Sequence, residues 1–404
     1  MTRPLDGVRV LEVAAWMAAP GATAVMADLG AAVVKVEPLR GDAVRGVIRQ
    51  PQMPNGVPQL DASFQLDNRG KRGIAVALNT PAGQELVRRL AGDVDVFVSN
   101  LLAPRQAKFG LDADRLLAGN PRLVHATLSG FGLEGPDAAR PGFDITAFFG
   151  RGGITHSVTE PGQQAPRARP AQGDHTAALA LLAAVLAALR MVESTGEGQV
   201  VDVNLHATAM WTMATDLSAT LYDGVDPPML GRRQRRHALQ DSFRCADDRW
   251  VLLFMPEPHW WPTFCDLVGR PEWAADPRFE TVASRREHMP EITDLMDELF
   301  VTRPLPEWGA LFDEARITWG PAATVAEVAA DPHAAATGLF PTLEHPTAGT
   351  FRTVAAPMRL RGVDTAPRTV APELGEHTRD VLREAGLSGG EVEQLVSDGV
   401  VGVA

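Results

Sequence analysis

Two clusters of basic residues and one aspartate have the clearest chemical potential in this sequence. The clusters are Asn68–Arg72 (NRGKR) and Gly231–His237 (GRRQRRH). Arginine and lysine bind phosphate well, so each cluster could capture a phosphorylated ligand, although a solvated charged loop is the simpler interpretation. Asp174 stands directly before a long apolar stretch, which predicts a helix N-cap. His175 follows it, but neighbouring residues on a helix do not face each other, so an Asp–His pair is not expected.

Other catalytic motifs are missing from the sequence. The turn after the first predicted strand reads WMAAPG, with one glycine where a dinucleotide-binding loop has three, and Glu37 is interpreted as a polar strand end. The ten histidines show no zinc spacing, and there is no G-x-S-x-G or Walker motif. Cys245 and Cys265 have no nucleophile signature and are expected to be buried. We therefore expect neither a metal nor a tightly bound cofactor, with a nicotinamide oxidoreductase as an alternative that cofactor absorbance would test.

Strands and helices alternate over the first 130 residues, which predicts a parallel α/β sheet covered on both faces. Apolar runs predict strands over 8–13, 31–38, 73–79, 94–100 and 122–130. Between them, helical patterns cover 20–29, 81–91 and 113–120.

The remaining sequence changes character twice. Residues 130–173 are rich in Gly, Pro and Arg and are predicted to form long loops with a short helix over 145–149. A long helix over 174–192, a strand over 200–205 and a helix over 206–222 follow. After a linker at 223–231 we expect a smaller α+β unit, with a hairpin over 242–255 that turns at Asp247–Asp248 and helices over 258–267, 291–300 and 305–312. A strand pair around residue 350 and further helices end the sequence.

Length, charge and hydropathy narrow the class of protein. At about 150 residues per domain, 404 residues indicate two or three domains. A net charge of −12 disfavours nucleic-acid partners, because such binding depends on neutralising phosphates. The longest clean apolar run, Ala177–Leu189, is too short to span a bilayer, so no membrane is expected. With two cysteines and no signal-peptide pattern, the sequence indicates a cytoplasmic protein.

An ordered set of motifs resembles the family III CoA-transferases, the group that includes formyl-CoA transferase. The motifs are LDGVRVLEV, ADLGAAVVKVEP, NRGKRGIAVAL, LSGFGLEGP, PGFD, GD before the long helix, TGEGQVVDVNL and APELGEHTRDVL, in this order. The resemblance implies a Rossmann-like large domain built from both chain ends (1–222 and 336–404), a small domain at 223–335, and an interlocked homodimer. It also implies that Asp174 attacks an acyl-CoA thioester and carries CoA to a small carboxylic acid.

The same resemblance assigns the CoA contacts residue by residue. The positions that match the family's CoA-binding segments are Met17, Ala18, Arg40, Arg69, Gly70, Lys71, Arg72, Asn100, Leu101, Leu102, Lys108 and Arg140. Trp16, Phe148 and Phe149 are aromatic residues that could line a roomy apolar pocket, or could equally be ordinary core.

The sequence departs from the family pattern in two segments, NLLAPR and RRHALQDSF, and two other functions stay open. An α-methylacyl-CoA racemase of the same fold needs a histidine in a G-H-D segment, but Phe143 stands there and cannot transfer a proton. The racemase alternative would be supported only if His156 or His175 lay across the pocket from Asp174. A non-catalytic CoA-binding relative is the other alternative.

Overall fold

The computed structural model describes residues 2–46, 60–235 and 237–404, which form two compact units. Unit 1 comprises Met1–Ser157, Pro166–Val225 and His333–Ala404, and unit 2 comprises Val158–Ala165 and Asp226–Pro332. The larger unit is therefore built from both ends of the chain. The boundaries expected from the sequence, after residues 222 and 335, lie three residues before Val225 and three residues after Pro332.

A seven-stranded sheet forms the centre of unit 1. Its strands are β1 (Arg9–Val13), β2 (Ala32–Glu37), β3 (Arg72–Val76), β4 (Val96–Ser99), β5 (Val124–Ser129), β6 (Gln199–Asn204) and β12 (Val401–Gly402). They follow the order β12-β3-β2-β1-β4-β5-β6, and every neighbouring pair is parallel except β12 with β3. The connections reverse direction between β1 and β4, which is where ligands usually bind in such sheets.

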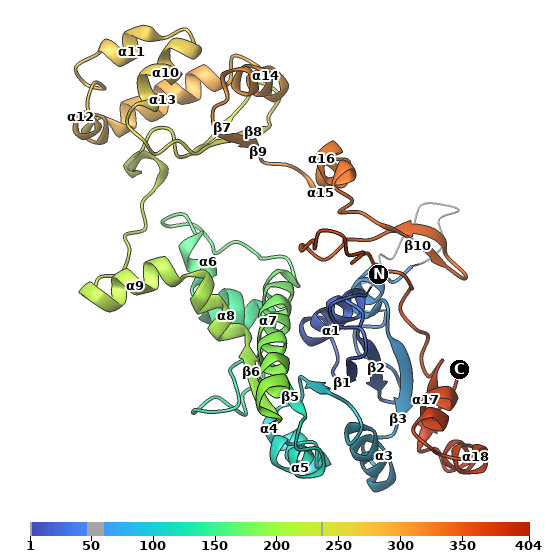
Figure 1. Ribbon diagram of the computed structural model, residues 1–404. Coiled ribbons are helices and arrows are strands. Elements are labelled where there is room, and N and C mark those ends of the chain that lie inside the picture. Colours follow the sequence, from blue (N-terminus) through green and yellow to red (C-terminus); the bar gives the residue numbers. More distant parts are fainter. Residues whose placement is uncertain (1, 47–59, 236) are drawn as a thin grey trace. The chain divides into compact units, whose positions relative to one another are not determined.

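Helices cover both faces of this sheet. Those of unit 1 are α1 (Ala18–Asp28), α2 (Ala62–Asn68), α3 (Pro81–Ala91), α4 (Ala103–Phe109), α5 (Ala113–Gly119), the π-helix η1 (Asp144–Arg151), α6 (Ile154–Ser157), α7 (Gln172–Thr195), α8 (Leu205–Thr212), α9 (Ala214–Asp223), α17 (Thr378–Glu384) and α18 (Gly389–Ser397). On one face α1 lies beside α7, as Figure 1 shows, while α3, α5, α17 and α18 supply the apolar core of the other face.

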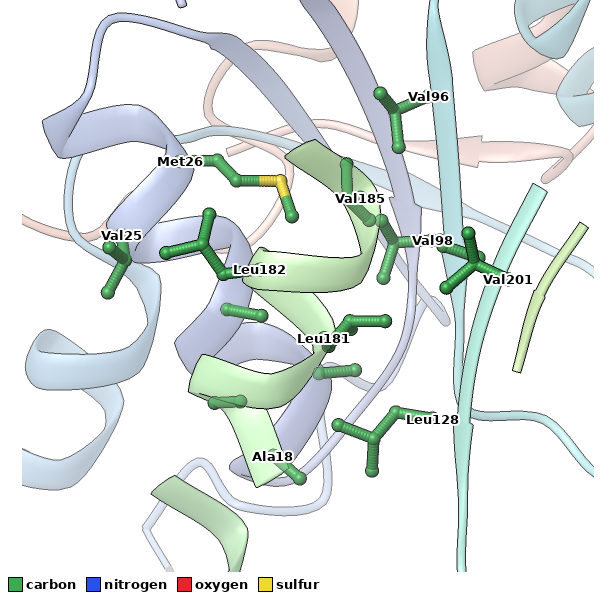
Figure 2. Close-up of a cluster of buried hydrophobic side chains, with 14 of the residues drawn as sticks. Ala18, Val25, Met26, Val96, Val98, Leu128, Leu181, Leu182, Val185 and Val201 are labelled. Carbon is green, nitrogen blue, oxygen red and sulfur yellow. The ribbon is translucent and has the colours of Figure 1, made fainter. Parts of the chain in front are cut away.

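Alternation along β1 explains the two cores. Val10 packs into the α1–α7 core, whereas Leu11 and Val13 point to the opposite core. The α1–α7 core contains Val25 and Met26 of α1, Leu181, Leu182 and Val185 of α7, and Val96, Val98, Leu128 and Val201 of the strands (Figure 2). This packing fixes the first turn of α7 against the start of α1.

Three sequence expectations differ from the structure of unit 1. The helix expected over 206–222 is two helices, α8 and α9, which are separated at Met213. The short helices α2, α4 and α6 and the strand β12 were not expected. The helix α7 has 24 residues and is, by length and composition, capable of crossing a membrane, although Leu181, Leu182 and Val185 on it are buried in the protein core.

Unit 2 is a small antiparallel sheet covered by helices. Its elements are η2 (Arg232–Gln234), β7 (Ser242–Arg244), β8 (Trp250–Leu253), α10 (Trp260–Leu267), α11 (Pro271–Ala275), α12 (Val282–Glu287), α13 (Met289–Phe300), α14 (Leu305–Ala315), β9 (Trp319–Pro321) and α15 (Val325–Ala329). The strand order is β7-β8-β9, and the expected hairpin at Asp247–Asp248 is confirmed. Next come α16 (Pro332–Ala336) and, in unit 1, the hairpin of β10 (Thr342–His345) and β11 (Gly349–Arg352).

Candidate active site

The turn between β1 and α1 is held by side chains from two other loops. The N–H of Ala15 donates to Oδ1 of Asn100 at 3.1 Å, and Nδ2 of Asn100 donates to the carbonyl of Ala15 at 2.6 Å. The N–H of Trp16 donates to Oδ1 of Asp42 at 3.0 Å. Trp16 has φ 69°, a left-handed backbone that is uncommon for a bulky residue. Such a conformation persists only where the surroundings enforce it, and these hydrogen bonds do so.

Asp174 lies inside the first turn of α7. The helix begins at Gln172, and the preceding Ala171, which is the N-cap residue, has φ 74° and a side chain that cannot cap this end. The expected N-cap role of Asp174 is therefore wrong, because the helix already includes Gln172 and Gly173. Its carboxyl group instead lies near a helix N-terminus, where backbone N–H groups favour negative charge.

Gly173 lets a second carboxylate approach this turn. The N–H of Gly173 donates to Oδ1 of Asp144 at 3.1 Å. A Cβ atom on Gly173 would lie 2.3 Å from Oδ1 of Asp144 and 2.4 Å from Cγ of Phe148, so no larger residue fits. The glycine of the Gly-Asp pair thus has a packing reason: it brings Asp144 beside Asp174.

The surroundings of Asp174 favour its neutral form. Burial raises the pKa of the Asp174 carboxyl to about 7, and the negative charges of Asp144 and Asp67 act in the same direction. The imidazole of His175 opposes them. Burial also raises the pKa of Asp144, whose Oδ2 is buried and has no hydrogen-bond partner among the described residues. Asp174 is therefore only partly ionised near neutral pH, as is common for catalytic carboxyl groups.

His175 faces α2. Its Nε2 lies 3.0 Å from Oδ1 of Asp67, which is buried, and this hydrogen bond is the main cause of the raised pKa of His175. The expectation that His175 does not pair with its neighbour Asp174 agrees with this geometry. An imidazole that holds a proton against Asp67 places a positive charge near Asp174.

A buried charge network lies beneath the turn. Lys71 Nζ donates to Oε2 of Glu12 at 2.7 Å, to the carbonyl of Asp67 at 2.7 Å and to the carbonyl of Pro20 at 2.9 Å. Lys35 Nζ lies 2.8 Å from Oε1 of Glu12 and 2.9 Å from Oδ2 of Asp42. Burial lowers the pKa of Lys71 to about 8, while the two lysines together lower that of Glu12 to about 2 against its own burial. The network links the residues that hold Trp16 and His175.

A pocket of about 550 Å³ opens at the carboxyl ends of β1 to β4. Val13, Val36 and Val76 line it at the strand ends. Side chains of the following loops complete it, including Trp16, Leu39, Arg40, Leu78, Asn79, Leu101, Arg105 and Phe109. Its size and its mixture of apolar walls with two arginines suit a nucleotide-like ligand. It lies where the order of the sheet reverses.

The expected CoA-binding residues lie in three kinds of place: in the pocket or the cavity beside it, in the turns and helix starts around it, and in contacts elsewhere in the fold or on its surface. Arg40 and Leu101 line the pocket, and Lys108 lines an adjacent cavity with Arg105. The turn residues Met17 and Ala18 are buried, Asn100 holds Ala15, and Leu102 precedes α4.

The remaining expected residues make contacts inside the fold or on its surface. Arg69 is buried and pairs with Asp28 at 2.7 Å, and Lys71 is enclosed in the charge network. Between them, Gly70 has φ 76°. Arg72 pairs with Glu384, while Arg140 lies 3.7 Å from Asp137 and over the ring of Phe131.

Other groups considered in the sequence are occupied by structural contacts. Glu37 accepts hydrogen bonds from Arg45 and from the N–H of Asp42. In the second basic cluster, Arg232, Arg233 and Arg235 form ion pairs within unit 2, and Arg236 lies outside the described residues. Burial raises the pKa values of the Cys245 and Cys265 thiols to about 11 and 12. In the described part of the chain, no three His, Cys, Asp or Glu side chains are grouped as a metal site requires.

The three aromatic residues singled out in the sequence divide between the two alternatives given there, core and pocket wall. Phe148 belongs to the core at 4% exposure, with Phe149 packed partly buried against that core. Trp16 instead meets Phe143 edge to face, with ring centroids 5.5 Å apart. Sequence reasoning missed Asp67, Asp144 and Arg105. For Asp144, the signal is its place in the PGFD segment directly after Phe143.

Comparison with known proteins gives a uniform result. Residues 5–378 match the model of "CoA-transferase family III". The chain is 30% identical over 401 residues to the (R)-2-hydroxy-4-methylpentanoate CoA-transferase of Clostridioides difficile, covering 98% of this chain and 99% of that protein. It is 31% identical over 424 residues to the formyl-CoA:oxalate CoA-transferase of Streptomyces avermitilis, covering 99% and 100%.

A solved structure agrees with these relatives. The crystal structure of a CaiB/BaiF family protein from Brucella suis has a TM-score of 0.83 and 30% sequence identity, covering 95% of this chain and 100% of that one. The mixed α/β fold with its central parallel sheet is thus shared with that structure. One relative is named for a branched monocarboxylic acid and the other for oxalate, so their names do not choose the acid used here.

Proposed function

Because the chain belongs to CoA-transferase family III, we propose that it moves CoA between an acyl-CoA thioester and a carboxylic acid through a thioester on Asp174. The observation that carries this proposal is the half-buried Asp174 carboxyl at the first turn of α7, beside Asp144 and with a pKa of about 7. A carboxyl group in this setting is a nucleophile whose reactivity the surrounding charges control.

The first half-reaction exchanges one thioester for another. The ionised Asp174 attacks the thioester carbonyl, and the C–S bond breaks to give a mixed anhydride and CoA thiolate. The thiolate then attacks the aspartyl carbonyl, which releases the donor acid as a carboxylate and leaves CoA on Asp174. The acceptor carboxylate repeats these two steps in reverse and leaves as its CoA ester. Backbone N–H groups of the first turn of α7 favour the negative charge that develops on the carbonyl oxygen.

The pocket at the strand ends is the proposed CoA site. Arg40 and Arg105 line it and suit the phosphates of CoA, since guanidinium groups bind phosphate with paired hydrogen bonds. Leu101 and Lys108 lie on the same side of the sheet. For Arg69 and Lys71 we propose a supporting role, because both make buried contacts that hold the turn and α2.

A homodimer is proposed from the surface of α8 and α9. Trp211, Leu221 and Tyr222 are 82%, 86% and 93% exposed in the single chain. Large apolar side chains that are this exposed are typical of surfaces that another chain covers. Changing Leu221 and Tyr222 to aspartate should shift the mass by light scattering to that of a monomer; an unchanged mass would contradict the proposal.

The compartment is proposed from the cysteines. Cys245 and Cys265 are unpaired and buried, which suits the reducing cytoplasm. Racemisation has no support at Phe143, whose ring contacts Trp16 and has no proton to transfer. His175 lies near Asp174, but it follows Asp174 on the same helix turn and its Nε2 is held by Asp67, so it is not proposed as the second base.

Intact-protein mass spectrometry after incubation with acyl-CoA donors tests the covalent mechanism. We expect a CoA adduct that hydroxylamine converts to a hydroxamate, located on Asp174 by peptide mapping. Asp174→Asn should abolish it, whereas the matched change Asp137→Asn, at a carboxylate paired with Arg151, should not. CoA transfer without any adduct on Asp174 would refute this mechanism, and α-proton exchange with solvent in place of transfer would indicate the racemase.

A further inference from the structure

We propose that Trp16 and Phe143 form an acyl-binding wall that selects monocarboxylic acids with an apolar or aromatic side chain, and that disfavours dicarboxylic acids. This inference rests on the proposed function, because it concerns the acyl group that is carried to Asp174. It names the substrate class for that same site.

The position of the two rings relative to Asp174 follows from covalent neighbours and hydrogen bonds. Phe143 immediately precedes Asp144, which accepts the hydrogen bond from Gly173 and whose charge acts on Asp174. Trp16 also lines the proposed CoA pocket. An acyl group that extends from CoA in that pocket to Asp174 therefore passes beside Trp16 and Phe143.

The rings are available for contact with a substrate. Trp16 is 37% exposed and Phe143 is 55% exposed, although both are large apolar residues, and Ile145 beside them is 43% exposed. Their edge-to-face contact, with an interplanar angle of 82°, holds the two rings in one arrangement. The hydrogen bond to Asp42 fixes the left-handed backbone of Trp16, so this half of the wall is in place before a substrate binds. Covering these surfaces with an apolar side chain is favourable.

The charges around Asp174 are unfavourable for a second carboxylate. The hydrogen bond from Gly173 holds Asp144 beside Asp174, and the negative charges of Asp144 and Asp67 both act on Asp174. His175 already holds Asp67. The nearest lysine of the network, Lys71, is enclosed by Glu12 and backbone carbonyls. A dicarboxylic acyl group would thus bring its free carboxylate to two existing carboxylates without a partner.

The test compares three donors in the first half-reaction. Butanoyl-CoA and succinyl-CoA are matched, since they differ by a terminal methyl group against a carboxylate, and 3-phenylpropanoyl-CoA adds an aromatic ring. The rate of CoA-adduct formation on Asp174 is measured for each by quenched mass spectrometry at subsaturating donor. We expect butanoyl-CoA to react at least about tenfold faster than succinyl-CoA, with 3-phenylpropanoyl-CoA the fastest, as is usual for apolar pockets.

Variants identify the wall. Phe143→Ala should reduce the preference for 3-phenylpropanoyl-CoA over butanoyl-CoA by about tenfold, and Phe143→Lys should raise the relative rate of succinyl-CoA. Phe143 is exposed, so its variants should fold. Trp16→Ala is a secondary variant, because Trp16 has a left-handed backbone and its replacement also changes the conformation of the turn. Trp250→Ala is the matched control: this unit 2 residue is 41% exposed and should leave the preferences unchanged.

The outcomes separate the two proposals. The acyl wall would be refuted if adducts formed as fast from succinyl-CoA as from butanoyl-CoA, or if Phe143→Ala and Phe143→Lys left the donor preferences unchanged. Either result would leave the proposed transferase mechanism standing. The absence of any adduct on Asp174 from all three donors would overturn the proposed mechanism and the wall together.

Discussion

Replacing Asp144 by asparagine is expected to extend CoA transfer to lower pH. The nucleophile is the ionised form of Asp174, so the rate falls as the pH drops through its pKa of about 7. After burial, the charge of Asp144 is the largest cause that raises this pKa. The asparagine side chain in the Asp144→Asn variant would keep an acceptor oxygen for the N–H of Gly173 but carries no charge. The pKa of Asp174 should therefore fall toward its ordinary value of 3.8.

The size of the effect depends on pH. With a pKa of about 7, only about one molecule in a hundred has an ionised Asp174 at pH 5, and each unit by which the pKa falls raises this fraction about tenfold. Above pH 8 the group is already ionised, so the gain there should be less than about twofold.

The pH profile of kcat/KM from pH 4.5 to 9 measures this shift. The groups that face Asp174 are Asp144, Asp67 and His175, and only the first is changed. Asp137→Asn, on the loop before η1, controls for general charge effects and should leave the acid limb in place. An acid limb that stays or moves to higher pH in Asp144→Asn would refute the electrostatic reasoning.

Three further predictions follow from the same charges. Asp174→Asn should raise the free energy of unfolding by roughly 1–3 kcal/mol at pH 8, because the raised pKa of Asp174 in the folded state lowers the stability of the parent protein as the pH rises from about 4 to about 7. An increase in melting temperature over the parent protein that is larger at pH 4 than at pH 8 would contradict this. Asp67→Asn should lower the titration midpoint of His175 in an NMR pH titration, and an unchanged midpoint would show that the 3.0 Å contact is not what sustains it. Lys71→Ala should cost about 3–5 kcal/mol in chemical denaturation, since Glu12 would lose a buried partner; a normal midpoint with a raised KM for acyl-CoA would instead assign Lys71 to substrate binding.

Local signals were sufficient for many elements of the fold. The helix expected over 81–91 is found as Pro81–Ala91, because Thr80 caps it and Pro81 favours a first turn. The strands β1 to β5 agree with their apolar runs, since strands buried on both faces are nearly continuous in apolar residues, and the edge strand β6 agrees with the run expected over 200–205. The seven-residue helix α2 was not recognised.

Contacts between residues far apart in the chain could not be predicted from local sequence patterns. The two-residue strand β12 exists only because Val401 and Gly402 pair with β3. At the site, Asp144 precedes Gly173 by 29 residues and Asp67 precedes His175 by 108, so neither pair has a spacing signal. Asp174 itself was identified by resemblance, whereas the local pattern gave the wrong role because it placed the helix start too late.

The position of β12 has a consequence for biosynthesis. The edge of β3 is closed by Val401–Gly402, and every residue of unit 2 lies between them in the chain. During translation the nascent chain therefore contains β1 to β6 with the β3 edge unpaired while unit 2 is still being made. Open strand edges invite pairing with other chains, so this interval is when the polypeptide is most exposed to aggregation and has most to gain from a chaperone. Slow codons placed after residue 332 would lengthen that interval.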